Sequence, residues 1–263
     1  VREGAQSLLA DGVGTLLDIG NSDASSSANR AGELGGLRLL FRQELIGWKG
    51  ASKQLSDRKK ELHKRAGKWD LDRAQPDVDG LSVHAPHSTH PNLIAAVAQD
   101  EALHRKLFTI HLAEGVEEGE FLTTGGGLWK EWFQQERIPT KIGGPWRDGW
   151  ELLSKKIPHG TRTLLIHGNL LGERSLREIA LNNVSIVHCP LSHHFFGHID
   201  PPLRTWVRLG IPIALGSDSL ASSPTLSLWE SMRLLKKRED FSDNTILRWA
   251  TEGGAAALGL SGI

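Results

Sequence analysis

The stretch Leu107–Glu118, LFTIHLAEGVEE, joins a short apolar run to a histidine, an acidic residue and the start of a longer polar segment. Similar apolar runs return along the chain, each followed by a turn and a longer amphipathic stretch. They lie at Gly14–Ile19, Leu37–Phe41, Leu81–Val83, Leu107–Ile110, Thr163–Ile166, Val184–Val187 and Ile211–Leu215. Because these runs lack strict alternation of apolar and polar residues, they predict parallel strands that are buried on both faces.

The longer stretches between the runs predict helices. These stretches are Pro91–Leu107, Gly149–Lys156, Ser175–Asn182, Pro202–Leu209 and Leu226–Lys237. The last of them, LSLWESMRLLKK, has its apolar positions near the helical period of about 3.6 residues. Strands that alternate with helices indicate a parallel α/β fold. Since seven strands are visible, we expect a TIM-like (β/α)8 barrel that is incomplete in this chain.

Two segments do not fit the repeating pattern. Gln43–Asp79 is rich in Lys, Arg and Asp and predicts an exposed helix followed by a loop. Gly125–Pro145 combines two glycine clusters with Trp129 and Trp132. Long insertions of this kind after a barrel strand often act as lids or as walls of a substrate site.

Composition excludes several classes of protein. The chain has 263 residues, with 31 Lys plus Arg and 31 Asp plus Glu, so no net field attracts nucleic acid or an anionic membrane. No apolar stretch approaches the ~20 residues that a membrane-spanning helix needs. Cys189 is the only cysteine, so an internal disulfide is excluded and a cytoplasmic location is expected. We expect one barrel domain over residues 1–263, truncated at both ends.

Potential metal ligands and acid–base groups follow five of the apolar runs. They are His84, His111, His167, His188 and Asp218. A single histidine at a strand end is more often structural than functional. Five such endings in order favour a site, because the carboxyl ends of barrel strands meet at one mouth, where active sites are built.

His111 and Glu114 form the most informative pair. If the strand ends at His111, Glu114 lies one turn further on, at the edge of the same mouth. The imidazole then holds a divalent cation while the carboxylate moves a proton to and from the substrate. The alternative is that Glu114 opens the next helix and only complements its dipole.

Asp218 and His167 are the other two candidates for catalysis. An ionised Asp218 beside a cation is suited both to binding the metal and to accepting a proton from the attacking water. Its alternative role is to cap the next helix, which Ser219 or Ser222 would do equally well. His167 either orients the water or binds the metal, and the alternative is a buried, hydrogen-bonded histidine.

Four further histidines have weaker signals. His188 either supports the site or simply packs in the core. His193, His194 and His198 are expected in a loop, solvated or facing the substrate.

Six stretches in the same order resemble the amidohydrolase superfamily. They are VHAPHST (83–89), TIHLAEGVEE (109–118), LLIHGN (164–169), VHCPLSHHFFGH (187–198), ALGSDSLASSPTLSLWESMRL (214–234) and TILRWATEGGAAALGL (245–260). They are most similar to the deaminase and chlorohydrolase branch, which includes S-adenosylhomocysteine, aminodeoxyfutalosine and guanine deaminases and triazine hydrolases. The last stretch resembles the helix that closes that barrel.

The resemblance implies one catalytic divalent metal, zinc or alternatively iron, and assigns roles to individual residues. His111 and Asp218 are implied as metal ligands, Glu114 as the proton shuttle and His167 as the group that positions water or substrate. His84 is implied as a substrate contact. Because His84 stands where some relatives have a lysine that bridges two metals, a mononuclear site follows.

The chain departs from the family pattern at several places. The family's first strand ends in a His-x-His pair that supplies two metal ligands, and no such pair precedes Gly14, so the first strand is expected to be missing. The small C-terminal β-domain is also absent. His193 replaces a common Asn and His87 a common Tyr, which bears on substrate choice, and we expect His84, His188 and His193 to bind substrate.

The expected function is hydrolysis of a non-peptide C–N bond, with deamination of a heteroaromatic amine first. One alternative is a chlorohydrolase or amide hydrolase that uses the same residues. The other is a catalytically inactive barrel that only binds a ligand, which the absent His-x-His pair favours. We expect a small-molecule substrate, neither nucleic acid nor membrane as a partner, and a homodimer as an open alternative.

Overall fold

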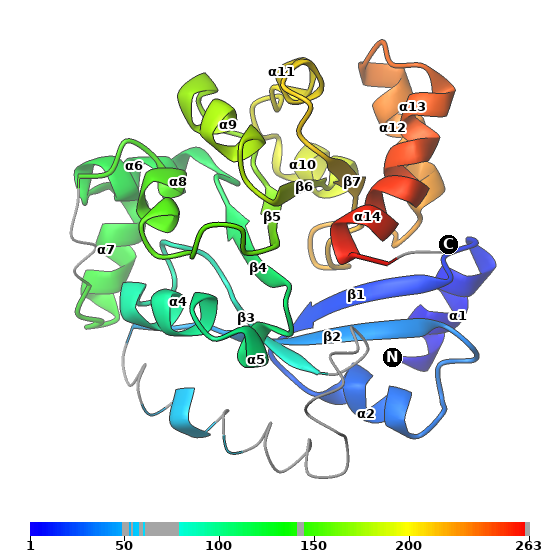
Figure 1. Cartoon of the computed structure of the whole chain (residues 1–263), viewed down its shortest axis with the longest axis horizontal. Coiled ribbons are helices and arrows are strands. Elements are labelled where there is room, and N and C mark those ends of the chain that lie inside the picture. The colour runs from blue at the N-terminus through cyan, green and yellow to red at the C-terminus, as the bar shows by residue number, and fades with distance from the viewer. Residues whose placement is uncertain (49–52, 54, 58–59, 61–78, 141–144, 261–263) are drawn as a thin grey trace.

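The computed structural model describes residues 1–48, 53, 55–57, 60, 79–140 and 145–260, with strands at the centre and helices around them (Figure 1). The described strands are β1 (Thr15–Gly20), β2 (Arg38–Leu45), β3 (Gly80–Val83), β4 (Phe108–Leu112), β5 (Thr163–His167), β6 (Val184–His188) and β7 (Ile213–Leu215). Every pair of neighbouring strands is parallel. The seven predicted strands are confirmed.

The strands follow one another in space in the order of the sequence. Hydrogen bonds link β1, β2 and β3 in one sheet and β4, β5, β6 and β7 in a second. The two sheets meet where the His111 amide donates to the His84 carbonyl over 2.7 Å and the Thr109 hydroxyl contacts the Ser82 hydroxyl at 2.7 Å. Within the described residues β1 and β7 each pair on one side only, so the barrel is not closed between them.

Strand β2 extends further than the sequence suggested. It runs to Leu45, and Gln43 and Leu45 are buried, so the prediction of an exposed segment from Gln43 onward is wrong at its start. Buried neighbours on β3 hold both residues in the sheet, in the register Gln43↔Leu81 and Leu45↔Val83. The rest of the predicted segment lies mostly outside the described residues.

Helices join and cover the strands. The described helices are α1 (Arg2–Ala10), α2 (Ala24–Arg30), α4 (Pro91–Ala98), α5 (Glu101–His104), α6 (Val116–Thr124), α7 (Gly127–Gln135), α8 (Gly149–Ser154), α9 (Glu173–Ala180), α10 (Pro190–Phe196), α11 (Leu203–Arg208), α12 (Leu228–Arg238), α13 (Asp243–Arg248) and α14 (Gly254–Leu258), with a π-helix, η1 (Trp249–Gly253), between the last two.

One predicted helix is wrong in its continuity. The stretch Pro91–Leu107 holds two helices, α4 and α5, because Asp100 takes an extended backbone and its carboxylate accepts the amide of Ala102 as an N-cap. The other four predicted helices are confirmed as α8, α9, α11 and α12 with shifted ends. For α12 the hydroxyl of Ser227 accepts the amide of Glu230 and fixes the first turn.

The C-terminal helices pack directly on the last strand. A Cβ atom added to Gly253 would lie 2.1 Å from the carbonyl oxygen of Ile213 on β7, so only glycine permits this approach of η1. The contact seats η1 and α14 against the end of the sheet, where the resemblance implied a closing helix.

The apolar core lies between the sheet and the helices. Phe108, Ile110 and Leu112 alternate along β4, and each has 0% of its surface exposed. The opposite residues of β4, Thr109 and His111, face the inside of the barrel, where Thr109 contacts Ser82. The period of two therefore places His111 on the face from which an active site is built.

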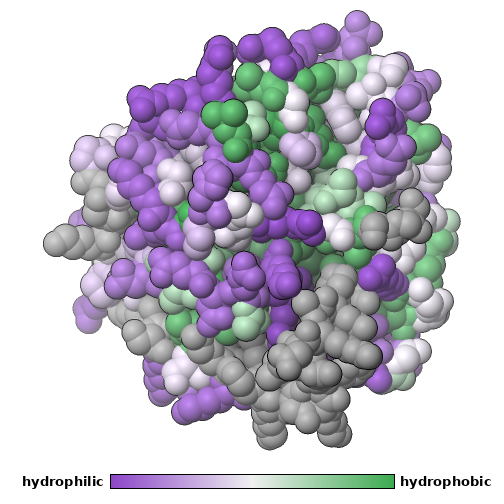
Figure 2. Space-filling view, in the orientation of Figure 1, coloured by the Kyte–Doolittle hydropathy of each residue, from purple (hydrophilic) through white to green (hydrophobic). Residues whose placement is uncertain are grey.

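The outer surface is mostly polar. On the side shown in Figure 2, hydrophilic residues predominate and apolar residues form small interrupted patches. This distribution suits helices that turn their apolar sides to the sheet. Among the described helices, none has both the length and the apolar character required to cross a membrane.

Candidate active site and metal centre

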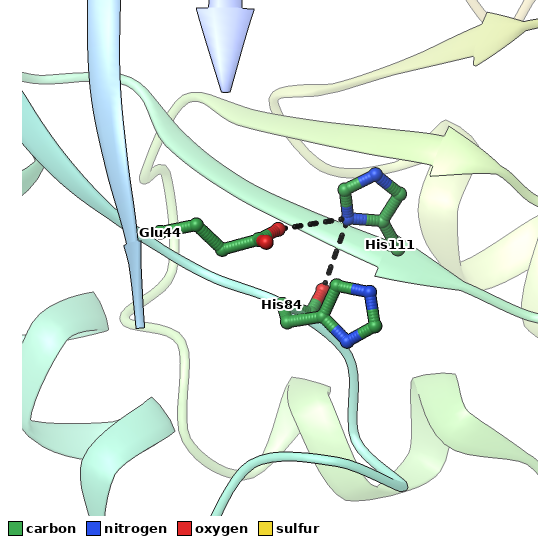
Figure 3. A group of neighbouring side chains, drawn as sticks. All are labelled: Glu44, His84 and His111. Atoms are coloured by element: carbon green, nitrogen blue, oxygen red, sulfur yellow. Dashed lines mark hydrogen bonds and ion pairs between the residues drawn. The ribbon is translucent and has the colours of Figure 1, made fainter. Parts of the chain in front are cut away.

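Two groups of metal-ligating side chains lie at the carboxyl ends of the strands. One group is Glu44, His84 and His111, and the other is Glu114, His167 and Asp218. Within each group the ligand atoms lie within 4.8 Å of one another. Figure 3 shows the first group gathered together, with Glu44 from β2, His84 from the residue after β3 and His111 from β4.

His111 belongs to the first group, and its ring also approaches His167 of the second. Its Nδ1 atom is 3.2 Å from the His84 carbonyl oxygen and 3.5 Å from Oε1 of Glu44. The centroid of its ring is 5.1 Å from that of His84 and 5.5 Å from that of His167. Burial lowers the pKa of His111, while the charge of Asp218 works in the opposite direction. The imidazole therefore connects the two halves of the mouth.

Glu114 lies outside the helix that follows it. Helix α6 begins at Val116, and the acidic residues of its first turn are Glu117 and Glu118, so the role of Glu114 as a helix-opening residue is wrong. Its Oε1 atom is 3.5 Å from Nε2 of His167. The Glu118 carboxylate accepts the Glu114 amide at 3.1 Å, which fixes the backbone that carries this side chain.

Asp218 is oriented by three donors. Its Oδ2 atom accepts hydrogen bonds from the hydroxyls of Ser192 at 2.5 Å and Ser222 at 2.9 Å, and Oδ1 accepts the amide of Ser219 at 2.8 Å. No described helix begins there, since α12 is capped by Ser227, so the helix-capping alternative is wrong. Burial works to raise the pKa of Asp218, but the hydrogen bond from Ser192, the nearby His167 and the hydrogen bonds from Ser222 and Ser219 hold it below its usual value.

The backbone leaves regular geometry at three places around the mouth. Ala113, His167 and Asp218 have φ angles of 53°, 75° and 60°, in the left-handed region that residues with a Cβ tolerate poorly. Strict alternation along β5 would place His167 with Leu165, which packs in the same core cluster as α9. The imidazole instead faces Glu114, so the left-handed turn accompanies its inward direction.

The glycine-rich insertion reaches the mouth through α7. The centroid of the Trp129 ring lies 4.3 Å from that of His87, with the ring planes inclined by 30°, and the His87 and His84 centroids are 5.8 Å apart. Nδ1 of His87 is 3.9 Å from Oε2 of the buried Glu118. Trp129 of α7 therefore lies beside His87, whose ring contacts that of His84, while residues 141–144 of the insertion lie outside the described part of the chain.

His188 and His193 belong to a separate cluster. Their rings are 5.8 Å apart, and His188 also contacts Trp206 at 6.3 Å. Both are buried, and neither joins the two ligand groups found among the described residues. The prediction that His193 and His194 lie in a loop is wrong, because α10 begins with Pro190 and continues through both of them.

Buried histidines in this region are neutral at pH 7. Burial lowers the pKa of His84 to about 4 and the pKa values of His87, His167 and His188 to about 3. A neutral imidazole is the form that binds a metal ion.

Three buried carboxyl groups shift in the opposite direction. Burial raises the pKa values of Glu44, Glu114 and Glu118 to about 7. For Glu114 the charge of Asp218 adds to this effect. A carboxyl group with a pKa near neutrality can both donate and accept a proton at pH 7.

These opposite shifts predict that the metal-free chain is most stable near pH 6.5. Below that pH the unfolded chain protonates its histidines, from their usual pKa of 6.5, while the folded chain does not, so acid favours unfolding. The raised pKa values of the three carboxyl groups offset part of this loss of stability down to about pH 4.5, because the folded chain binds their protons more readily than the unfolded chain does. Above pH 6.5 the folded chain still holds carboxyl protons that the unfolded chain has released, so stability falls through about pH 7. Thermal midpoints of chelator-treated protein test this, and a midpoint that rises steadily to pH 8.5 would contradict it.

The residues present suit a divalent metal ion. Neutral imidazoles and an ionised aspartate are the ligand types that zinc prefers. Oε1 of Glu44 is buried and makes no hydrogen bond with the described residues, so an acceptor is available beside His111.

Sequence reasoning did not assign several of these contacts. Glu44 follows the apolar run Leu37–Phe41, so the sequence alone does not distinguish a substrate contact from a surface ion pair there. Glu118 was overlooked, although its spacing of four residues from Glu114 places both on one side of a turn. The contact of Trp129 with His87 joins distant segments and leaves no local signal.

Comparison with known proteins identifies the family and the fold. Among curated proteins, the chain is 27% identical over 188 residues to an aminodeoxyfutalosine deaminase of Nitratiruptor sp., covering 69% of this chain and 44% of that protein. It is 31% identical over 188 residues to a 5-methylthioadenosine/S-adenosylhomocysteine deaminase of Pyrococcus furiosus, covering 68% of this chain and 40% of that protein. The chain thus spans less than half the length of these relatives.

Solved structures with a similar fold cover nearly the whole chain. The aminofutalosine deaminase of Helicobacter pylori matches with a TM-score of 0.85 at 20% identity, over 98% of this chain and 64% of that one. An atrazine chlorohydrolase of Arthrobacter aurescens, complexed with zinc, matches with a TM-score of 0.74 at 17% identity, over 99% of this chain and 60% of that one. These neighbours show the barrel fold. The sequence profile of the amidohydrolase family matches residues 1–262, and the protein belongs to that family.

Proposed function

We propose that this protein hydrolyses a non-peptide C–N bond and deaminates a heteroaromatic amine, such as an aminopurine or a related nucleoside. The observation that carries the proposal is the meeting of Glu114, His167 and Asp218 at one mouth of the barrel. Membership of the amidohydrolase family and the deaminase names of the relatives support it.

The proposal requires one divalent metal ion, zinc first and iron as the alternative. We assign His111 and Asp218 as its ligands among the described residues. When bound, such an ion lowers the pKa of water at the site towards neutrality. The lowered pKa values of His111 and Asp218 keep both groups in the deprotonated form that metal binding needs.

Each of the three converging residues has a separate task. Asp218 accepts the proton that water gives up as it adds to the ring carbon bearing the amino group. Glu114, with a pKa of about 7, delivers its proton to the neighbouring ring nitrogen. The proton that Asp218 took from water then passes through Glu114 to the departing amine, and the hydroxyl proton of the adduct returns to Glu114 as the C–N bond breaks. His167 is neutral and supports the charge that develops on the oxygen. Ammonia leaves, and the carbon keeps the oxygen of water.

We assign substrate binding to His84, His188 and His193, with a direct contact for His84 and an indirect role for the other two. His84 faces the mouth next to His111, so it is placed to contact the ring of the substrate. His188 and His193 are buried against each other, and the positive charge of a protonated His188 would act on His167. Their contribution is therefore to shape the wall behind His167.

Ammonia release from a panel of amines tests the proposed function. The panel contains adenosine, 5′-methylthioadenosine, S-adenosylhomocysteine, guanine and simpler aminopurines, with a chlorinated triazine assayed for chloride. Ammonia from a purine compound supports deamination. Chloride release alone would favour the chlorohydrolase alternative, and binding without turnover by zinc-loaded protein would favour a ligand-binding barrel.

Replacing Trp129 by Ala should raise KM roughly tenfold and change kcat less than twofold. Stacking of an aromatic side chain on a base contributes roughly 1–3 kcal/mol, and Trp129 borders the mouth without reaching the catalytic group of residues. Leu128→Ala is a matched control, because Leu128 lies on the same helix and is exposed. An unchanged KM in the Trp129 variant would contradict the role of α7 as a substrate wall.

A further inference from the structure

We propose that Glu44 is a positioning residue that sets the orientation and the proton location of the His111 imidazole. The carboxyl group lies beside the Nδ1 side of the ring and favours a proton there, so that Nε2 keeps its lone pair for the metal ion. This inference rests on the proposed function, because that function makes His111 a metal ligand.

The proton on His111 is located by the groups that surround Nδ1. Nδ1 faces the His84 carbonyl oxygen at 3.2 Å and the Glu44 carboxyl oxygen at 3.5 Å. A backbone carbonyl only accepts hydrogen bonds, so the short contact with His84 requires a proton on Nδ1. In a neutral imidazole the other nitrogen then has a free lone pair.

The orientation of the ring agrees with this assignment. In Figure 3 both dashed lines from His111 leave the same nitrogen, and the second nitrogen points away from Glu44 and His84. The His84 carbonyl oxygen also accepts the backbone amide of His111 at 2.7 Å, which keeps the acceptor in place. One side of the imidazole therefore faces Glu44 and His84, and the second nitrogen faces away from both of them.

Glu44 has no other structural task among the described residues. Its side chain is 9% exposed, and Oε1 makes no hydrogen bond of ordinary length. Its place on β2 follows from the register Glu44↔Ser82, which sets it beside the strand end that carries His84. A buried carboxyl group without a close donor is costly. The approach to Nδ1 of His111 is the polar contact that accompanies the burial of this carboxyl group.

The same three residues could instead bind a cation directly, since their ligand atoms lie within 4.8 Å. Binding of the cation through Nδ1 of His111 would need that nitrogen to lose its proton and its contact with the His84 carbonyl. Nδ1 of His84 is also committed, to the hydroxyl of Ser88. Carboxylates that hold the far nitrogen of a metal-binding histidine are a common device for raising its basicity and fixing its ring. The geometry favours this positioning role.

Zinc titration of the full chain without substrate tests the proposal. Glu44→Leu should weaken zinc binding by about 10- to 100-fold in competition with a chelator. Glu44→Gln should recover part of that loss, because the amide oxygen still accepts the Nδ1 proton. Glu33→Gln is the control, since Glu33 pairs with Arg2 on the surface and should leave zinc affinity unchanged.

Nitrogen-15 spectra of the metal-free chain give a second readout that folding alone would not move. The proposal expects a protonated Nδ1 and an unprotonated Nε2 on His111, and zinc should shift Nε2. A proton on Nε2, or unchanged zinc affinity in both Glu44 variants, would overturn it. Equal losses of zinc affinity in Glu44→Gln and Glu44→Leu, together with loss of an oxygen ligand in the X-ray absorption spectrum of bound zinc, would also overturn it. That result would favour direct ligation by Glu44. Correct zinc and nitrogen results without any ammonia release would leave the positioning role standing and refute only the deaminase.

Discussion

Replacing Asp218 by Asn should lower turnover by about 10²–10⁴-fold and weaken zinc binding as well. The amide keeps the size of the side chain but can neither accept the proton from water nor offer a negative charge to the metal. Hydrogen bonds from Ser192, Ser222 and Ser219 now hold the carboxylate in one orientation, and the amide nitrogen would face donors at some of these contacts.

Steady-state ammonia release and chelator competition measure the two effects of this substitution. Asp243→Asn is the matched control, because the Asp243 side chain is 87% exposed in the first turn of α13 and belongs to neither ligand group. Ser192→Ala and Ser222→Ala should each cause smaller losses than Asp218→Asn, since each removes one donor to Oδ2. Full zinc affinity with near-normal turnover in the Asn variant would exclude Asp218 from both roles.

Replacing Glu114 by Gln should lower kcat by about 10²–10⁴-fold while zinc affinity stays close to that of the parent chain. Glutamine cannot deliver a proton to the ring nitrogen or to the departing amine. It can still occupy the space beside His167, where Oε1 of Glu114 lies 3.5 Å from Nε2. The two variants therefore separate proton transfer from metal binding.

Glu120→Gln is the control for this second substitution, because Glu120 is exposed on α6, the helix that follows Glu114. The measurements are single-turnover and steady-state rates of ammonia release with zinc-loaded protein. A Glu114→Gln variant that keeps turnover within fivefold of the parent would remove Glu114 from the mechanism.

Local patterns account for most of the fold that sequence reasoning recovered. Apolar runs such as Thr163–Ile166 predict a strand from their own composition. The helix at Leu226–Lys237 is predicted from the spacing of its apolar residues. The helix break at Asp100 was missed because neither glycine nor proline marks it. The helix α7 inside the glycine-rich insertion was missed because Gly125, Gly126 and Gly127 read as a loop, whereas they end α6 and begin α7.

The sequence predicted the candidate site residues that follow strand ends. It did not predict the residues that are placed by contacts between neighbouring strands or distant segments. His111, His167 and Asp218 follow apolar runs, so their position along the chain indicates the mouth. Glu44 is different, because its burial comes from the neighbouring strand β3, and an Arg-Gln-Glu sequence by itself reads as surface. The contact between Trp129 and His87 likewise needs the folded chain.

The left-handed backbone at Ala113, His167 and Asp218 has an evolutionary consequence. Each of these residues holds a conformation that disfavours a Cβ atom by about 1 kcal/mol or more, and glycine would relieve it. Under the proposed function, the chemistry needs the side chains of His167 and Asp218 despite that cost. In a lineage that has lost its catalytic duty, glycine at these positions would be free to spread, and its appearance there would mark descendants that keep the barrel without the reaction.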